Sequence, residues 1–265
     1  MKLLIRIKYD GSGYCGYQYQ PGVPTVQGEL TEAFSRALGL RCNVTGCSRT
    51  DAGVHALGYC AAVEPTDVSL RGDDWLRIPL ARVHRAVGPY LSPAIAVTGA
   101  AAVSDTFHPR YDAIAKEYVY VINDSPVRDP FLEGRAYRFG RSIADDELER
   151  MCSAASSLAG RYDFSAFMAS GSDVTDTVRD LRRLDVRRVR DGICTITAEA
   201  DGFLYNMVRI LVGTLLDTAF GRIGVCDMGD ILASRKRERA GFTAPACGLY
   251  LRRVDYGENI EFSAL

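Results

Sequence analysis

The chain has 265 residues, of which 47% are hydrophobic and 25% charged, and its formal net charge is −1. A chain of this length can bury a core of its own, and it contains no run of about eighteen apolar residues that would span a membrane. A charge near zero argues against a protein that is basic over its whole surface. The first residues alternate like a strand and lack the apolar centre of a signal peptide, so we expect a globular, cytoplasmic protein.

The first part of the chain is predicted to consist of strands and helices in alternation. Apolar residues alternate with polar or charged ones over the first residues, MKLLIRIKYDG, which predicts a strand, and a glycine-rich loop follows it. Thr25 is the predicted N-cap of a helix whose apolar residues share one face. The remaining predicted elements of this part are strands at 42–48, 57–64 and 93–103 and a helix at 80–88.

The second part repeats this alternation. A strand is predicted at 116–124, and Ser142 with Asp145 forms an S-x-x-D capping box for an amphipathic helix. A hairpin is predicted from 181–200, and residues 203–220 are apolar almost all round, which predicts a buried central helix. We therefore expect an α+β protein of two similar halves, residues 1–105 and 106–265.

Cysteine and histidine residues do not form a metal-ligand pattern. The eight cysteines contain no C-x-x-C pair, and the three histidines lie far apart in the sequence. Reduced cysteines in the core are the simplest interpretation, and we expect no metal site.

The stretch GCSRTDAGVHALG places one carboxylate, Asp51, among small and turn-forming residues. This composition predicts a strand end or loop, where chemistry often resides. His55, a single histidine with no partner visible in the sequence, is expected to have a structural role.

Arg209 lies within the apolar segment 203–220. A guanidinium keeps its charge, and burying it without a partner costs several kcal/mol, so it requires an acid or a route to solvent. A core salt bridge, a side chain that reaches solvent, and a pair with Asp51 in a cleft all remain open from position alone.

Tyr118 and Tyr120 lie on one face of a predicted strand, where packing is the usual role of tyrosine. Stacking on a base that has left its helix is the alternative. Basic segments at 179–190 and 235–239 are either solvated faces or phosphate contacts.

The chain resembles the tRNA pseudouridine synthase A family. The resemblance rests on GCSRTDAGVHALG together with five blocks in the family's order, namely YDGSGYCGYQ, FHPRYDAIAKEYVY, DFSAFMASG, FLYNMVRILVGTLL and AGFTAPACGLYL. Tyr17, Tyr162 and Cys247 depart from residues common in relatives, and none of them is a residue to which the family assigns chemistry.

The resemblance implies roles for four residues. Asp51 is the catalytic aspartate, acting at the ribose C1′ as a nucleophile or as a base on the ribose that gives a glycal. Arg49 takes the space of the flipped base, Tyr118 stacks on the uridine, and Arg209 pairs with Asp51. No metal, nucleotide or redox cofactor is implied.

The resemblance also implies a fold and a substrate. The fold is two ferredoxin-like or RRM-like halves that share a central antiparallel sheet, with helices on the outer face and the active-site cleft between the halves. The substrate is uridine at positions 38 to 40 of the tRNA anticodon stem-loop, held by a homodimer, with no membrane partner.

Three alternatives stay open on the residues alone. A member of the same family could act on other tRNA positions. A non-catalytic RNA-binding module would explain the α/β halves but not an acid beside RNA. A retaining glycosidase would need a second carboxylate about 5 Å from Asp51.

Overall fold

The computed structural model describes residues 1–71, 75–172, 174–257 and 260–263. The chain forms two compact units, one of Met1–Ile114 with Leu251–Leu265 and one of Ala115–Tyr250. Within the first unit the C-terminal segment is tied back by a hydrogen bond from the Ile114 N–H to the Asp255 carbonyl (2.8 Å) and one from the Tyr256 hydroxyl to the Pro109 carbonyl (2.7 Å). Hydrogen bonds between residues so far apart in the sequence leave no local pattern. The expected halves, which divide after residue 105, therefore do not place residues 251–265 with the first unit.

In its described residues the first unit contains four complete strands, two α-helices and most of β10 Leu249–Asp255. Their bounds are β1 Lys2–Tyr9, α1 Val26–Leu38, β2 Cys42–Gly46, β3 His55–Pro65, α2 Val83–Val87 and β4 Ile95–Val103. The strand order is β4-β1-β3, with β2 pairing the other edge of β3. All three pairings are antiparallel, and this order with this alternation of elements is the ferredoxin-like arrangement.

Local signals in this unit are confirmed where they depend on neighbouring residues. The Thr25 side chain accepts a hydrogen bond from the Gly28 N–H and caps α1. Leu30, Ala33 and Phe34 are buried on one face of that helix, as its apolar spacing predicts. The predicted helix 80–88 divides into a 3₁₀ turn at Leu80–Arg82 followed by α2.

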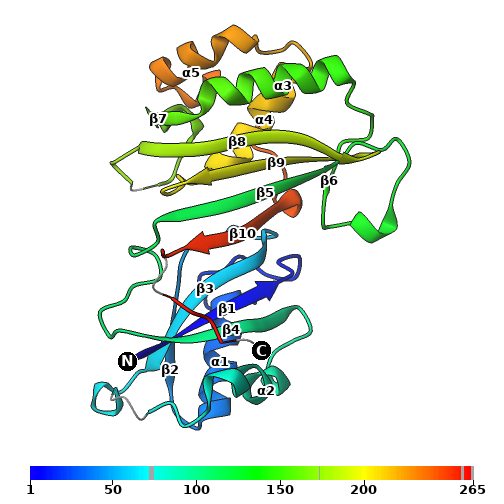
Figure 1. The fold of residues 1–265 in the computed structure, drawn as a ribbon. Helices are drawn as coiled ribbons and strands as arrows, with labels where there is room; N and C mark the ends of the chain where they lie inside the picture. The colour runs from blue at the N-terminus through cyan, green and yellow to red at the C-terminus, as the bar shows by residue number, and fades with distance from the viewer. Residues whose placement is uncertain (72–74, 173, 258–259, 264–265) are drawn as a thin grey trace. The chain divides into compact units, whose positions relative to one another are not determined.

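The second unit has the same alternation of strands and helices, with three additions. Its elements are β5 Ala115–Asn123, β6 Tyr137–Arg138, α3 Asp145–Leu158, β7 Gly160–Asp163, β8 Val178–Arg190, β9 Ile193–Ala200, α4 Met207–Ala219, α5 Met228–Ser234 and the start of β10 Leu249–Asp255. The strand order is β5-β9-β8-β7 with antiparallel pairs, whereas β6 pairs parallel with β5. Figure 1 shows α3, α4 and α5 on one side of this sheet. The expected α+β class is confirmed.

Helix α4 is the buried helix that the sequence predicts. All but two of its thirteen residues are buried, the exceptions being Arg209 and Asp217. The helix begins at Met207 and not at Phe203, because Asn206 before it adopts a left-handed conformation (φ 59°) that a continuing α-helix does not allow. Among the described residues no helix is long and apolar enough to cross a membrane.

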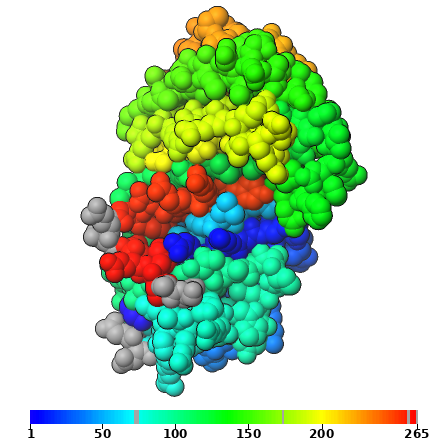
Figure 2. Space-filling view, turned by 45° about the vertical axis from the view of Figure 1, so that its right-hand side comes forward, coloured from blue at the N-terminus to red at the C-terminus, as the bar shows by residue number. Residues whose placement is uncertain are grey.

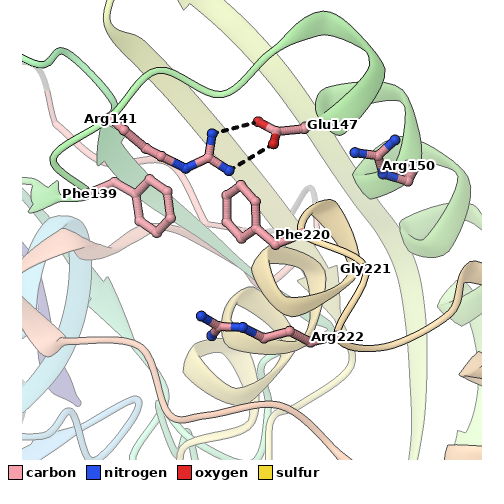
Figure 3. A pocket seen from close by; sticks show the side chains of 7 residues that line it. All are labelled: Phe139, Arg141, Glu147, Arg150, Phe220, Gly221 and Arg222. Carbon is pink, nitrogen blue, oxygen red and sulfur yellow. Dashed lines mark hydrogen bonds and ion pairs between the residues drawn. The ribbon is translucent and has the colours of Figure 1, made fainter.

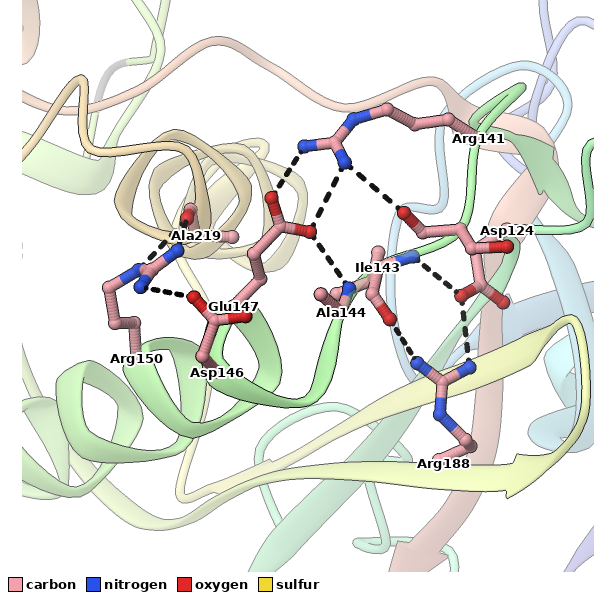
Figure 4. Close-up of polar contacts among 10 residues, drawn as sticks. Asp124, Arg141, Ile143, Ala144, Asp146, Glu147, Arg150, Arg188 and Ala219 are labelled. Carbon is pink, nitrogen blue, oxygen red and sulfur yellow. Dashed lines mark hydrogen bonds and ion pairs between the residues drawn. The ribbon is translucent and has the colours of Figure 1, made fainter.

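The predicted S-x-x-D capping box of α3 is wrong by two positions. The helix has Ala144 at its N-cap, and the Glu147 carboxylate accepts the Ala144 N–H (2.9 Å). The preceding N–H, that of Ile143, donates to the Asp124 carboxylate (3.0 Å), which fixes the chain before the helix (Figure 4). A residue 19 positions away in the sequence therefore holds the residue just before the N-cap of α3.

Asp124 is fully buried and is held by Arg188 of β8. Its carboxylate accepts from Arg188 Nη1 at 3.0 Å, and Arg188 also donates to the Ile143 carbonyl (Figure 4). Removing one partner of a buried pair leaves a charge in a medium of low polarity.

We expect Arg188→Met to destabilise the protein by about 3 kcal/mol in urea unfolding, because the Asp124 carboxylate would lose its partner. The matched control is Arg187→Met, since Arg187 is 70% exposed and pairs with Asp185 at the surface. That change is expected to cost less than about 1 kcal/mol. Equal effects of the two substitutions would contradict the prediction.

Candidate active site

Asp51 lies in the loop of residues 47–54, which connects β2 to β3 in the first unit. We refer to this segment as the Asp51 loop. Asp51 is half-buried, Thr50 is buried, and Arg49 is exposed. The loop position expected for Asp51 is confirmed, and a partly exposed carboxylate beside an exposed guanidinium can meet a substrate from solvent.

Backbone hydrogen bonds fix the Asp51 loop on both sides of its carboxylate. The Asp51 carbonyl accepts from the Val54 N–H (3.1 Å), and the Thr50 carbonyl accepts from the Tyr17 N–H (3.0 Å). At the start of the loop the Cys47 N–H donates to the Cys60 carbonyl of β3 (3.0 Å). The loop is therefore attached both to the neighbouring strand and to the glycine-rich loop that follows β1.

The glycine-rich loop approaches the Asp51 loop so closely that side chains would not fit. A Cβ at Gly11 would lie 2.0 Å from the Val54 carbonyl oxygen, and one at Gly16, where φ is +96°, would lie 2.8 Å from the Thr50 carbonyl oxygen. Glycine is the residue that allows this contact and this conformation. His55 adds a structural bond, because its Nδ1 accepts the Gly11 N–H (3.0 Å).

Tyr118 and Tyr120 lie on β5 in the second unit, and both are buried. The Tyr118 ring packs edge-on against Phe203 with ring centroids 5.1 Å apart. The Tyr120 hydroxyl donates to the Pro245 carbonyl (2.7 Å). Burial raises the pKa of Tyr120, so this hydroxyl stays protonated and can donate.

Arg209 is half-buried on α4 and is held by bonds within the second unit. Its Nε donates to the Ala244 carbonyl (2.7 Å), and its Nη1 donates to the Asn206 side-chain oxygen (2.8 Å). These two hydrogen bonds to neutral acceptors orient the guanidinium within the second unit.

The four residues predicted to act on substrate are divided between the two units. Arg49 and Asp51 belong to the first, and Tyr118 and Arg209 belong to the second. The pairing of Asp51 with Arg209 stays a prediction. Asn206 and Ala244, which hold Arg209, were not found from the sequence, although an asparagine just before a helix is a recognisable capping signal.

The first basic segment forms most of β8, which lies at the surface in Figure 2, where β8 and β9 are yellow-green to yellow. Some of its arginines are paired with acids, as Arg183 is with Asp185 (2.6 Å). Arg187 is 70% exposed, and so is Arg235 of the second basic segment, which contacts Asp163. Exposed arginines of this kind can reach phosphates while they keep a carboxylate neighbour.

A pocket of about 670 Å³ lies in the second unit, where the first turn of α3 meets the end of α4 (Figure 3). It is lined by Phe139, Arg141, Glu147, Arg150, Phe220, Gly221 and Arg222, so it contains none of the four predicted site residues. The rings of Phe139 and Phe220 stack with centroids 5.2 Å apart, and the Arg141 guanidinium lies 4.0 Å from the Phe220 centroid. This packed aromatic and cationic contact joins the segment before α3 to the end of α4.

The charges of that pocket are balanced by carboxylates. Arg141 bonds both oxygens of Glu147, at 2.7 and 3.2 Å, and Arg150 bonds Asp146 (2.8 Å) together with the Ala219 carbonyl that ends α4 (Figures 3 and 4). Arg222 bonds Asp217 (3.1 Å). We interpret the pocket as a structural junction and not as the site of chemistry, because each of its guanidinium groups already has an acidic partner.

Within the described residues no group of three or more His, Cys, Asp or Glu side chains is arranged to hold a metal ion. All eight cysteines lie in the described part of the chain and are thiols not joined by disulfides, and those at 42, 47, 60 and 194 are buried. Burial raises the pKa of the Cys42 and Cys194 thiols to about 11, which favours the neutral, unreactive form. Cys15 and Cys226 are exposed, so the core placement expected from the sequence does not hold for them.

Comparison with known proteins gives consistent matches. Residues 154–257 match a family model described as tRNA pseudouridine synthase. A protein of Thermoanaerobacter sp. (strain X514) is 41% identical over 254 residues, covering 96% of this chain and 99% of that protein. One of Bacillus subtilis (strain 168) is 39% identical over 258 residues, covering 97% and 99% respectively. Both are named tRNA pseudouridine synthase A.

Among solved structures, a Cbf5-Nop10-Gar1 complex matches with a TM-score of 0.39 and 12% identity, covering 93% of this chain and 50% of that chain. Overlap at this level adds nothing to the family assignment, which depends on the sequence relatives.

Proposed function

This chain belongs to the tRNA pseudouridine synthase A family and is therefore an isomerase that makes pseudouridine in tRNA, and from this premise we propose that it acts at positions 38 to 40 of the anticodon stem-loop with Asp51 as its nucleophile. The observation that carries the proposal is the fixed, half-buried Asp51 loop within a chain that aligns with its relatives over nearly its whole length. Membership of this family sets aside the non-catalytic RNA-binding module and the glycosidase.

The reaction requires three changes at one nucleotide. The bond from N1 of uracil to the ribose C1′ breaks, the uracil rotates while it stays bound, and a bond forms from C5 to C1′. The C5 proton leaves and N1 gains a proton, so no electrons are gained or lost and no redox cofactor is required. The Asp51 carboxylate supplies the group that acts at the sugar, either by attack on C1′ or by removing a ribose proton to give a glycal.

The other three residues are proposed to hold the substrate. Arg209, preset by Asn206 and Ala244, would keep Asp51 ionised and oriented, since a nearby cation favours the charged form of an acid. Tyr118 would stack on the uracil during rotation. Arg49 is exposed beside Asp51 and would occupy the space that the extruded base leaves.

The direct test is to map pseudouridine in tRNA transcripts treated with the purified protein. We expect modification of uridines at positions 38, 39 and 40, and none in transcripts that carry cytidine at all three. Modification confined to other positions would support the alternative of a different site in tRNA and would overturn the proposed specificity.

We expect Arg49→Ala to slow turnover of folded tRNA by about 100-fold and turnover of an oligonucleotide with an unpaired target uridine by less than about 10-fold. Extruding a base from a stacked stem costs a few kcal/mol, and less from a loose strand. The ratio of the two rates of pseudouridine formation measures the effect. Arg41→Ala, at an exposed arginine just before β2, is the matched control. Equal slowing on both substrates would contradict the base-flipping role.

We further propose that the protein is a cytoplasmic homodimer whose basic segments on β8 and at 235–239 contact phosphates of one tRNA. The exposure of Arg187 and Arg235 supports these contacts. Light scattering at micromolar protein concentration is expected to give twice the chain mass. A monomer both with and without tRNA would contradict the proposal.

A further inference from the structure

We propose that the hydroxyl groups of Tyr9 and Tyr59 are positioning groups for the Asp51 carboxylate, acting through Thr50 and Ser48. The proposal rests on the proposed role of Asp51 as the catalytic acid. It concerns how this chain keeps the nucleophile in place, and it involves only residues of the first unit.

Tyr9 is the last residue of β1, and its hydroxyl contacts Thr50, the residue before Asp51. Its hydroxyl and the Thr50 hydroxyl are 2.8 Å apart in a buried hydrogen bond, with the two residues 4% and 9% exposed. A buried hydroxyl pair is costly to separate, because each group would lose its partner in a place where water cannot replace it. The Thr50 side chain is thereby fixed, and the Asp51 backbone with it.

Tyr59, from the middle of β3, holds the same loop three residues before Asp51. Its hydroxyl donates to the Ser48 carbonyl and accepts the Ser48 N–H at 3.3 Å. Burial, reinforced by the neighbouring Tyr17, raises the pKa of Tyr59 well above its ordinary value. The hydroxyl therefore remains a donor at any pH at which the enzyme would work.

The two hydroxyls are themselves held by ring packing. The rings of Tyr17 and Tyr59 stack with centroids 4.4 Å apart, and the rings of Tyr9 and Tyr59 lie 5.7 Å apart at 60°. Three packed rings from β1, the glycine-rich loop and β3 have few alternative rotamers. The three rings form a rigid support for the Asp51 loop, and the hydroxyls of Tyr9 and Tyr59 bond to Thr50 and Ser48, on the N-terminal side of Asp51.

The packed tyrosines position Asp51 and take no part in the reaction. Removing one of the two hydroxyl groups should therefore lower kcat and leave the affinity for tRNA nearly unchanged. A displacement of about 1 Å at a reacting group can cost up to about 100-fold in rate, whereas phosphate and stacking contacts elsewhere maintain affinity for tRNA. We therefore expect Tyr9→Phe and Thr50→Val each to lower kcat about 10-fold, with KM for tRNA within twofold of wild type. Both changes preserve side-chain shape.

Three further variants separate positioning from general loss of structure. Thr50→Ser restores a hydroxyl and should recover most of kcat. In the double variant Tyr9→Phe with Thr50→Val, kcat should fall about 10-fold and not about 100-fold, because both substitutions break the same hydrogen bond. Tyr14→Phe removes a hydroxyl that bonds Glu29 and Ser92 instead, and it should leave kcat unchanged even if it lowers Tm.

The measurements are steady-state kcat and KM at a temperature well below the Tm of every variant. A Tyr9→Phe enzyme with wild-type kcat, or a double variant with multiplied losses, overturns the inference. Asp51→Asn is assayed in the same series. If it is inactive while Tyr9→Phe is normal, the positioning inference alone fails; if it turns over, the proposed function fails.

Discussion

Asp51→Asn is expected to bind tRNA as tightly as wild type, or slightly more tightly, and to release no tritium above background from tRNA that carries 5-tritiated uridine. Asparagine keeps the shape of the side chain and removes the charge that acts at C1′, so we expect turnover to fall by at least about 10⁴-fold. Affinity comes from phosphate and stacking contacts, and one negative charge fewer near phosphates favours binding.

The control for this substitution is Asp67→Asn, which makes the same chemical change at an exposed carboxylate of the first unit. Asp67 caps a short 3₁₀ helix through the Ser69 N–H (2.9 Å), so its replacement should affect only local stability. Turnover by Asp51→Asn comparable with that of Asp67→Asn would show that Asp51 is not the catalytic group. Loss of tRNA binding by Asp51→Asn would contradict the assignment of affinity to other contacts.

The elements of the fold could be predicted from the sequence where the determining residues are neighbours in the chain. The alternation in β1, the Thr25 cap of α1 and the apolar composition of α4 each produce a local pattern, and the structure confirms all three. The start of α3 could not be predicted in this way, because Asp124 holds the Ile143 N–H from another element. This bond joins residues 19 positions apart and leaves no local pattern in the sequence.

In the candidate site, too, local features could be predicted from the sequence and contacts between distant residues could not. The motif around Asp51 predicts a loop, and the loop is present, because small and turn-forming residues act locally. The residues that hold the loop could not be found, since Tyr9 and Thr50 are 41 positions apart and a tyrosine at a strand end gives no sign of its hydroxyl partner. The atoms that restrain Arg209 were missed for the same reason, because the Ala244 carbonyl is 35 positions away.

The segment that supplies the Ala244 carbonyl also packs against α4 at the level of the backbone. A Cβ at Gly213 would lie 1.8 Å from the Phe242 carbonyl oxygen and 2.7 Å from its carbon. The segment is held there by the Gly241 N–H bonding to the Thr214 hydroxyl (2.9 Å) and by the Ala244 N–H bonding to the Arg209 carbonyl (3.0 Å). Glycine at 213 is thus a condition for the contact that orients Arg209.

Gly213→Ala is accordingly expected to destabilise the protein by about 3 kcal/mol or more, because the added methyl must displace backbone and not a flexible side chain. For a chain of this size that corresponds to a fall in Tm of roughly 10 °C, measured by calorimetry. Helix propensity alone predicts the opposite sign, since alanine favours a helix over glycine by up to about 1 kcal/mol. Gly229→Ala in α5 measures the effect of helix propensity by itself, because no atom lies within 4 Å of a Cβ at that position. This substitution should raise Tm slightly. Opposite shifts in the two variants support the close backbone contact, and a Gly213→Ala protein as stable as wild type would show that residues 241–244 do not pack on α4 as described.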